Sequence, residues 1–182
     1  MTSRGTGVGV STAVMSLGSN LGDRFGYLRL AVHGFAAELV AVSPVYETAP
    51  WGGVEQPDFL NAVLIVAAQD HHEWDWLRRA KALEAEAGRV RGVHWGPRTL
   101  DVDVVTVRGP DGPVHSEHPD LLLPHPGAAM RNTVLRPWLD IDAAAELPGR
   151  GPVAALLAAL PDPDAGLRRL DDLTLSPPGG QR

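Results

Sequence analysis

Two kinds of apolar pattern alternate along the chain. Residues 10–17, 39–48, 59–68 and 99–107 carry short runs of β-branched and other apolar side chains bounded by turn residues, which predict strands. In the second run, Pro44 cannot donate a ladder hydrogen bond, which favours an edge strand or a bulge. The third run is apolar almost throughout, which favours a more central strand buried on both faces.

Between these runs, apolar residues recur at the spacing of one helix face. The segment that begins at Asp23 places them three or four positions apart, at Phe25, Leu28, Val32, Phe35 and Leu39. Residues 72–87 show a second amphipathic pattern, which ends at Gly88. We also expect a short helix in residues 128–139, ended by Pro137, and a last helix that begins at Pro152.

The order of these elements predicts the fold class. Strand, helix, strand, strand, helix, strand, followed by further helices, indicates an α+β sandwich around a mostly antiparallel sheet. The chain has 182 residues, of which 44% are apolar, and this suits one core rather than two. We expect a flexible N-terminus over residues 1–9, one domain over 10–160 and a mobile tail rich in Pro and Gly over 161–182.

Charge and composition exclude several classes of function. The formal net charge of −6 argues against a general nucleic-acid binder, which needs a basic surface to contact phosphates. The chain has no cysteine, so it has neither a disulfide nor a thiolate metal site, and it suits a reducing compartment such as the cytoplasm. The first residues match neither a signal peptide nor a membrane span, and we expect no membrane partner.

Two acids interrupt the fourth predicted strand. Side chains alternate along a strand, so Asp101 and Asp103 share one face while Leu100, Val102 and Val104 point to the other. Two carboxylates this close repel unless one is protonated or a cation lies between them. Mg²⁺ suits such a pair, because it binds a few carboxylates and completes its shell with water and phosphate oxygens. The alternative is a solvated strand edge with two ordinary surface acids.

Three arginines lie in the loop before this strand. Arg89, Arg91 and Arg98 carry guanidinium groups, whose geometry matches phosphate oxygens. Together with a metal-binding carboxylate pair they predict a site that holds a polyphosphate. A loop that merely forms salt bridges with nearby acids is the alternative.

Four blocks of sequence resemble 6-hydroxymethyl-7,8-dihydropterin pyrophosphokinase (HPPK) of folate biosynthesis. They are "SLGSNLGDR", "SPVYETAPWGGVEQPDFLNAV", "GRVRGVHWGPRTLDVDVV" and "LPHPGAAMRNTVLRPW", and they run from about residue 10 to about 142. The resemblance implies a ferredoxin-like α+β fold with mobile loops over the active site, usually monomeric. It also implies that the protein uses ATP and two Mg²⁺ ions to transfer a pyrophosphoryl group to the hydroxymethyl group of the pterin, giving AMP and the pterin diphosphate.

The resemblance also assigns residues to roles. It implies that Asp101 and Asp103 bind the metal ions and that Arg89 and Arg98 bind phosphate and act in catalysis, with Glu84 supporting the arginine loop. Further ATP contacts are implied at Arg91, His94, His125 and Arg131. Pterin contacts are implied at Thr48, Ala49, Trp51, Phe59, Asn61 and Trp95.

The chain departs from the family pattern at four positions. His94 stands where the family usually has Arg, so one cationic contact depends on pH. Thr133 stands in place of an aromatic residue that stacks on the pterin, a change worth on the order of 1 kcal/mol of binding. Ala49 replaces a common Pro, and Leu122 replaces a residue with a hydroxyl group.

Two other functions are compatible with these residues. One is a metal-dependent nucleotidyl transferase or phosphohydrolase that uses the same acids and arginines without a pterin. The other is a non-catalytic module that binds a pterin or a nucleotide, which His94 and Thr133 motivate. The reaction products distinguish these functions from pyrophosphoryl transfer.

Overall fold

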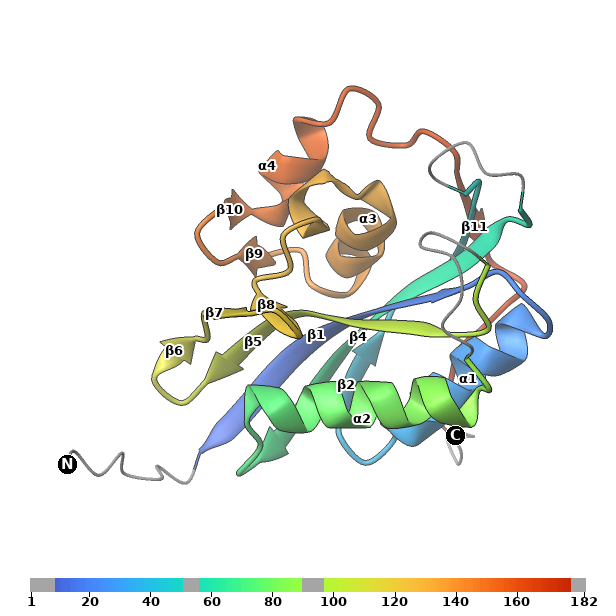
Figure 1. Ribbon diagram of the computed structural model, residues 1–182. Coiled ribbons are helices and arrows are strands. Elements are labelled where there is room, and N and C mark those ends of the chain that lie inside the picture. Colours follow the sequence, from blue (N-terminus) through green and yellow to red (C-terminus); the bar gives the residue numbers. More distant parts are fainter. Residues whose placement is uncertain (1–8, 51–55, 90–96, 178–182) are drawn as a thin grey trace.

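The computed structural model describes residues 9–50, 56–89 and 97–177, and within them an antiparallel sheet lies between two layers of helices (Figure 1). The main sheet has seven strands in the order β11-β3-β4-β1-β5-β6, with β2 also paired to β4. The long strands are β1 (Val10–Ser19), β4 (Phe59–Gln69) and β5 (Asp101–Gly109). The predicted α+β sandwich is confirmed, and the central order β3-β4-β1-β5 is that of a ferredoxin-like fold.

The second predicted strand forms as two short strands along one edge of β4. β2 (Leu39–Val42) pairs with the C-terminal half of β4, and β3 (Val45–Thr48) pairs with its N-terminal half. Between them Pro44 donates no hydrogen bond, and the Ser43 hydroxyl instead accepts one from the Val63 backbone N–H at 2.9 Å. The sequence favoured an edge strand or a bulge at Pro44; the structure divides the segment into two strands there, with a side chain replacing part of the ladder.

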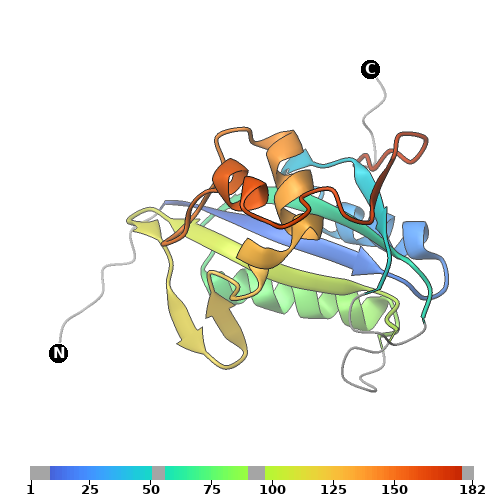
Figure 2. The same ribbon diagram turned by 90° about the horizontal axis from the view of Figure 1, so that it is seen from above.

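The two helical layers cover opposite faces of the sheet (Figures 1 and 2). α1 (Arg24–Gly34) and α2 (Glu73–Glu86) pack on one face, and η1 (Ala128–Met130), α3 (Asn132–Ile141) and α4 (Val153–Ala158) lie on the other. Each face has its own buried cluster, with Met15 and Leu64 in the first and Val14 and Val63 in the second. Alternation along the strands therefore sorts successive residues into two cores.

The C-terminal region departs from the sequence predictions. Pro137 lies inside α3 rather than ending it. The expected mobile tail from residue 161 instead contributes β11 (Leu167–Leu170), which pairs with β3, and buries Leu175 against the main core. The expectation is wrong for this described part, because sequence periodicity over four residues is too short to reveal a strand that depends on a distant partner. Residues 178–182 and 1–8 lie outside the described residues.

The segment between β5 and α3 contains three short strands. β6 (Gly112–Pro113) pairs antiparallel with the end of β5, and β7 (Ser116–His118) pairs with β8 (Leu121–Leu123) in a small separate sheet. β9 (Glu146–Leu147) and β10 (Gly151–Pro152) form another small pair before α4. Within the described ranges no helix is long and apolar enough to cross a membrane.

Candidate active site

Two cross-strand rows on the α3 side of the sheet place the candidate residues together. Gly18 on β1 pairs with Asn61 on β4 and with Asp101 on β5. Two residues earlier on β1, Ser16 pairs with Asp103 on β5. Residues paired across antiparallel strands point to the same face, so Asn61 and the two acids face the same side of the sheet, as the alternation predicted for Asp101 and Asp103.

Gly18 leaves room between Asn61 and Phe59 on one side and Asp101 on the other. A Cβ atom at this position would lie 3.6 Å from Asn61 Oδ1, 3.7 Å from the Phe59 ring and 4.0 Å from Asp101 Cβ. A larger side chain on the middle strand would therefore fill the space between β4 and β5. The glycine keeps the sheet surface open between the two groups of residues.

Asp101 accepts hydrogen bonds from two arginines. Arg89 Nη1 donates to its Oδ1 at 2.5 Å, and Arg98 Nη1 donates to its Oδ2 at 2.7 Å. Burial alone would lower the pKa of Arg89, but the charges of Asp101 and Glu84 outweigh burial and raise the pKa above its usual range. The two predicted phosphate-binding arginines are thus held beside the predicted metal-binding acid.

Glu84 anchors this cluster from α2. Its side chain is buried, its Oε1 accepts from Arg89 at 2.5 Å and from the Val102 N–H at 2.9 Å, and its Oε2 accepts from Lys81 at 3.0 Å. A buried carboxylate is tolerated only when charges and hydrogen bonds compensate for its lost solvation. Glu84 therefore joins helix α2, strand β5 and the arginine loop, as the family resemblance implied.

Replacing Glu84 by Gln is expected to destabilise the protein by about 2–4 kcal/mol, because Arg89 and Lys81 then lose a buried anionic partner. Unfolding in urea measures the change. Glu86→Gln on the same helix is the matched control, because Glu86 is exposed. Equal stability of the two variants would contradict the role assigned to Glu84.

Asp103 lies beside two further cationic or titratable side chains. His125 Nε2 and Arg131 Nη1 lie 3.9 and 3.8 Å from Asp103 Oδ2. Burial, together with the charge of Asp101, raises the pKa of Asp103 to about 6. Burial and Arg131 lower the pKa of His125, and the Gly127 N–H donates to its Nδ1 at 3.1 Å. The neutral ring then carries its proton on Nε2, which faces Asp103.

Asp103→Asn is expected to make the metal-free protein more stable at pH 7.5. The pKa of Asp103 is higher in the folded state, so its stabilising contribution is present below its unfolded pKa, near 4, and is lost as the pH rises through about 6. The gain over wild type should shrink at pH 4.5. Urea unfolding in a chelating buffer at both pH values tests this, with the exposed Asp111→Asn as the control for charge. An Asp103→Asn variant less stable than wild type at pH 7.5 would contradict this prediction.

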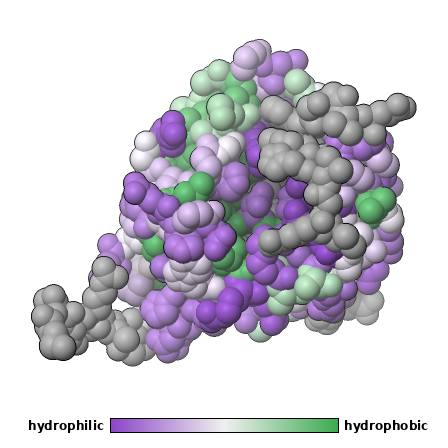
Figure 3. Space-filling model, viewed as in Figure 1, coloured by the Kyte–Doolittle hydropathy of each residue, from purple (hydrophilic) through white to green (hydrophobic). Residues whose placement is uncertain are grey.

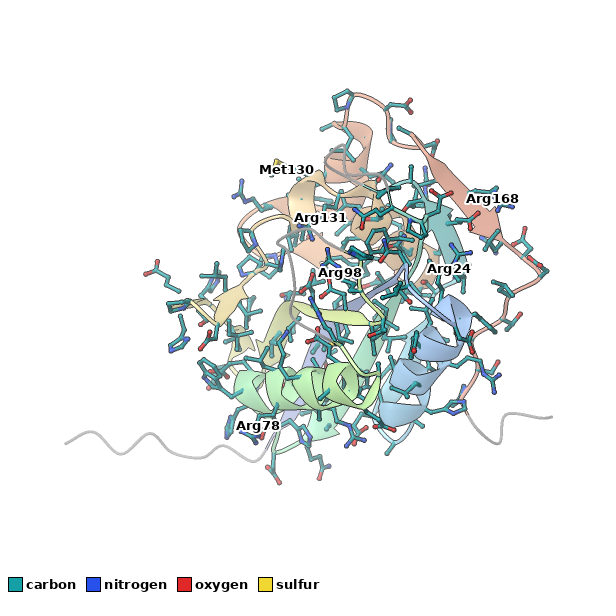
Figure 4. The ribbon with its side chains drawn as sticks, turned by 45° about the vertical axis from the view of Figure 1, so that its right-hand side comes forward. Arg24, Arg78, Arg98, Met130, Arg131 and Arg168 are labelled. Carbon is teal, nitrogen blue, oxygen red and sulfur yellow. The ribbon has the colours of Figure 1, made fainter. Side chains whose placement is uncertain are left out.

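The described residues that are predicted to contact the pterin also form a connected group. Asn61 Nδ2 donates to Thr48 Oγ1 at 2.8 Å, and the Arg98 guanidinium lies 5.6 Å from the centre of the Phe59 ring. Arg98 therefore contacts both the acid Asp101 and the aromatic residue at the start of β4. Figure 4 shows Arg98 and Arg131 near each other, with α2 below them and the α3 layer above. Outside the grey atoms, hydrophilic residues predominate on the face that Figure 3 shows.

A cavity of about 390 Å³ continues from Thr48 toward the C-terminal segment. Its lining is mostly apolar and comes from the end of β3, the start of α3 and the segment after α4: Thr48, Ala49, Pro50, Met130, Asn132, Thr133, Leu160, Pro161, Asp162, Ala165 and Gly166. Ala49, one of the predicted pterin contacts, and the short side chain of Thr133 both border it. The cavity and the acid–arginine cluster lie on the same face of the sheet.

The HPPK family model, described as 7,8-dihydro-6-hydroxymethylpterin-pyrophosphokinase, matches residues 14–143. The chain belongs to the HPPK family. It is 46% identical to the 2-amino-4-hydroxy-6-hydroxymethyldihydropteridine pyrophosphokinase of Mycobacterium tuberculosis, over 88% of this chain and 90% of the relative. It is 37% identical to the enzyme of the same name from Pseudomonas aeruginosa, over 84% of this chain and 93% of the relative.

Solved structures support the fold of the HPPK chain. Wild-type HPPK-DHPS of Plasmodium falciparum aligns with a TM-score of 0.60 and 13% sequence identity, over 88% of this chain. The chain spans 48% of that longer protein. At this identity the likeness concerns the fold alone, and it agrees with the antiparallel sheet and its two helical layers.

A metal ion in this HPPK chain would depend on few protein ligands. Among the described residues no group of three or more His, Cys, Asp or Glu side chains is arranged to hold one. Asp101 and Asp103 supply two carboxylates on one face, and burial together with the charge of Asp101 raises the pKa of Asp103. A cation that takes two carboxylates and completes its shell with water and phosphate fits this donor set, which is the preference of Mg²⁺.

The structure brings together most of the residues predicted for the site. Arg89, Arg98, Asp101, Asp103, His125 and Arg131 form one cluster, and Thr48, Phe59 and Asn61 adjoin it. The contacts predicted for Trp51, Arg91, His94 and Trp95 lie outside the described residues, and the mobility of the loops stays a prediction. No sequence pattern pointed to Asn20, which lies in the Gly-Ser-Asn turn of a resemblance block, but its side chain contacts Gln56, Pro57 and Arg98 beside the site.

Proposed function

We propose that the protein transfers a pyrophosphoryl group from ATP to the hydroxymethyl group of 6-hydroxymethyl-7,8-dihydropterin, giving AMP and the pterin diphosphate for folate biosynthesis. Its family membership and its relatives' names support this activity. The single observation that carries the proposal is the placement of Asp101, Arg89 and Arg98 in contact, on the sheet face that also holds Asn61. Acidic and arginine side chains suited to binding a polyphosphate thus lie next to residues suited to binding a flat heterocycle.

The chemistry requires the pterin oxygen to attack the β-phosphorus of ATP in line while AMP leaves. Such a transfer is catalysed mainly by position and by compensation of charge. Arg89 and Arg98 would contact phosphate oxygens, with His125 and Arg131 as further ATP contacts. The buried Nε of Arg98 has no acceptor within the described part of the chain.

The pterin would lie on the other side of Gly18. Asn61 and Thr48 already share a hydrogen bond and present polar groups suited to the edge of a pterin, while Phe59 supplies an apolar surface. Ala49, Trp51 and Trp95 complete the proposed pterin contacts. Because Thr133 is small, the cavity beside it widens this end of the site.

Two Mg²⁺ ions are the proposed metal cofactors, held by Asp101 and Asp103. When bound, Mg²⁺ would supply compensation for the negative charge that develops on the phosphates. Asp101 must then share its oxygens with the metal and with the arginines that contact it here. The pKa of Asp103, near 6, leaves it mostly ionised at neutral pH and makes it the best candidate to accept the proton of the attacking hydroxyl group.

Other aspects of the proposal rest on the sequence. A single compact sheet with two covered faces is compatible with a monomer, and the absence of cysteine is compatible with the cytoplasm. We propose small-molecule substrates only, with neither nucleic acid nor membrane as a partner.

Product analysis tests the proposed reaction. Purified protein is incubated with ATP, Mg²⁺ and the reduced hydroxymethylpterin, and the products are separated by liquid chromatography. Equal amounts of AMP and pterin diphosphate are expected, with neither formed when the pterin is omitted. Release of pyrophosphate would indicate a nucleotidyl transferase instead, and binding of both ligands without products would indicate a non-catalytic module.

A further inference from the structure

Asn20 is a buried polar residue at the junction of the two loops that border the site. It follows β1 directly, and its exposed fraction is 1%. A buried amide is costly unless its donors and acceptor are satisfied, so its partners indicate what it holds in place. Asn20 lies one row beyond Ser19, at the end of the strand that carries Gly18.

Four hydrogen bonds join Asn20 to these loops. Toward β5, its backbone N–H donates to the Arg98 carbonyl at 3.1 Å, and its Oδ1 accepts from the Arg98 N–H at 2.8 Å. Toward β4, its Nδ2 donates to Gln56 Oε1 at 3.0 Å and to the Pro57 carbonyl at 3.1 Å. These bonds fix the amide orientation, because a flipped amide would place its oxygen against the Pro57 carbonyl and its NH₂ against the Arg98 N–H.

The two segments joined by Asn20 also contact each other inside the site, through Arg98 and Phe59. Pro57 lies two residues before Phe59, and the Arg98 guanidinium lies 5.6 Å from the Phe59 ring centre while it donates to Asp101. Asn20 therefore closes a ring of contacts that runs through Arg98, Phe59 and Pro57. The amide holds the backbone at two points of this ring.

We infer that Asn20 is a positioning residue that fixes the phosphate-side Arg98 relative to the pterin-side Phe59, an inference that rests on the proposed function. The side chain is too deeply buried, and its polar atoms are too fully used, for it to contact either substrate. Asn20 affects the rate by holding the two substrates at the relative position in which their reacting atoms align. A displacement of about 1 Å between reacting groups can cost on the order of 100-fold in rate.

Two substitutions test this inference by removing different bonds. Asn20→Asp keeps an acceptor for the Arg98 N–H but cannot donate to Pro57, whereas Asn20→Ala removes every side-chain bond. Both variants are expected to lose roughly 10- to 100-fold in kcat. The dissociation constants for ATP alone and for the pterin alone, measured by calorimetry, are expected to change less than about threefold, because each half of the site stays intact.

Ser43→Ala provides the control for a merely structural role. Ser43 is 3% exposed and accepts a backbone hydrogen bond from Val63 within the same sheet, away from the acids and arginines. This variant should lose stability comparable to the Asn20 variants in urea unfolding while keeping kcat within about twofold. Folded Asn20 variants with wild-type kcat would overturn the inference, as would a loss confined to the binding of one substrate. A wild-type protein that forms no AMP would instead refute the proposed function.

Discussion

Asp101→Asn and Asp103→Asn are each expected to lower the rate of AMP formation by roughly 100-fold or more, the scale on which one preorganised electrostatic group contributes. Both changes preserve side-chain size and remove one negative charge. The two positions share a sheet face, and Asp101 also contacts Arg89 and Arg98. Steady-state assays across Mg²⁺ concentrations measure the effect.

Stability separates these two variants from each other and from a general folding defect. Asp103→Asn should be at least as stable as wild type at neutral pH because it removes a partly buried charge whose pKa is raised to about 6. Asp101→Asn weakens two ion pairs and should be less stable. The exposed Asp111→Asn should leave both rate and stability unchanged. Full activity in either site variant would show that its carboxylate is not a metal ligand.

Arg98→Ala is the second change with a large expected effect, a fall in kcat of roughly 100-fold or more. Arg98 contacts Asp101, lies over Phe59 and has a buried Nε donor without an acceptor within the described residues. Its charge is needed most as negative charge builds on the departing phosphate oxygen, so kcat should fall more than ATP affinity.

Arg98→Lys keeps the charge but loses the planar guanidinium group, and partial recovery is expected from it. Calorimetry of ATP binding and steady-state kinetics on the same preparations separate the two effects. An equal loss in kcat and in ATP affinity would assign Arg98 to binding of the ground state only.

The sequence predicted those features of the fold that follow from a short repeating pattern of apolar and polar residues. The alternation around Asp101 and Asp103 indicated their shared face, and the spacing of Leu28 and Val32 indicated the buried face of α1. Pro44 marked the break between β2 and β3 because it lacks a backbone donor.

Features that depend on distant partners could not be predicted in this way. β11 is four residues long and is stabilised by pairing with β3, and its Arg168 also pairs with Glu47. Pro137 is accommodated within α3, where sequence rules favour a helix end. Asn20 acquires its role only when segments 36 and 78 residues away are brought to it.

The most direct test of the central claim is a crystal structure with a non-hydrolysable ATP analogue, the pterin and Mn²⁺ in place of Mg²⁺. Anomalous scattering then locates the cation independently of any assay. Mn²⁺ is expected to be bound by the carboxylates of Asp101 and Asp103, with the triphosphate contacting Arg89 and Arg98. A nucleotide bound elsewhere, with only water beside the two acids, would contradict the claim.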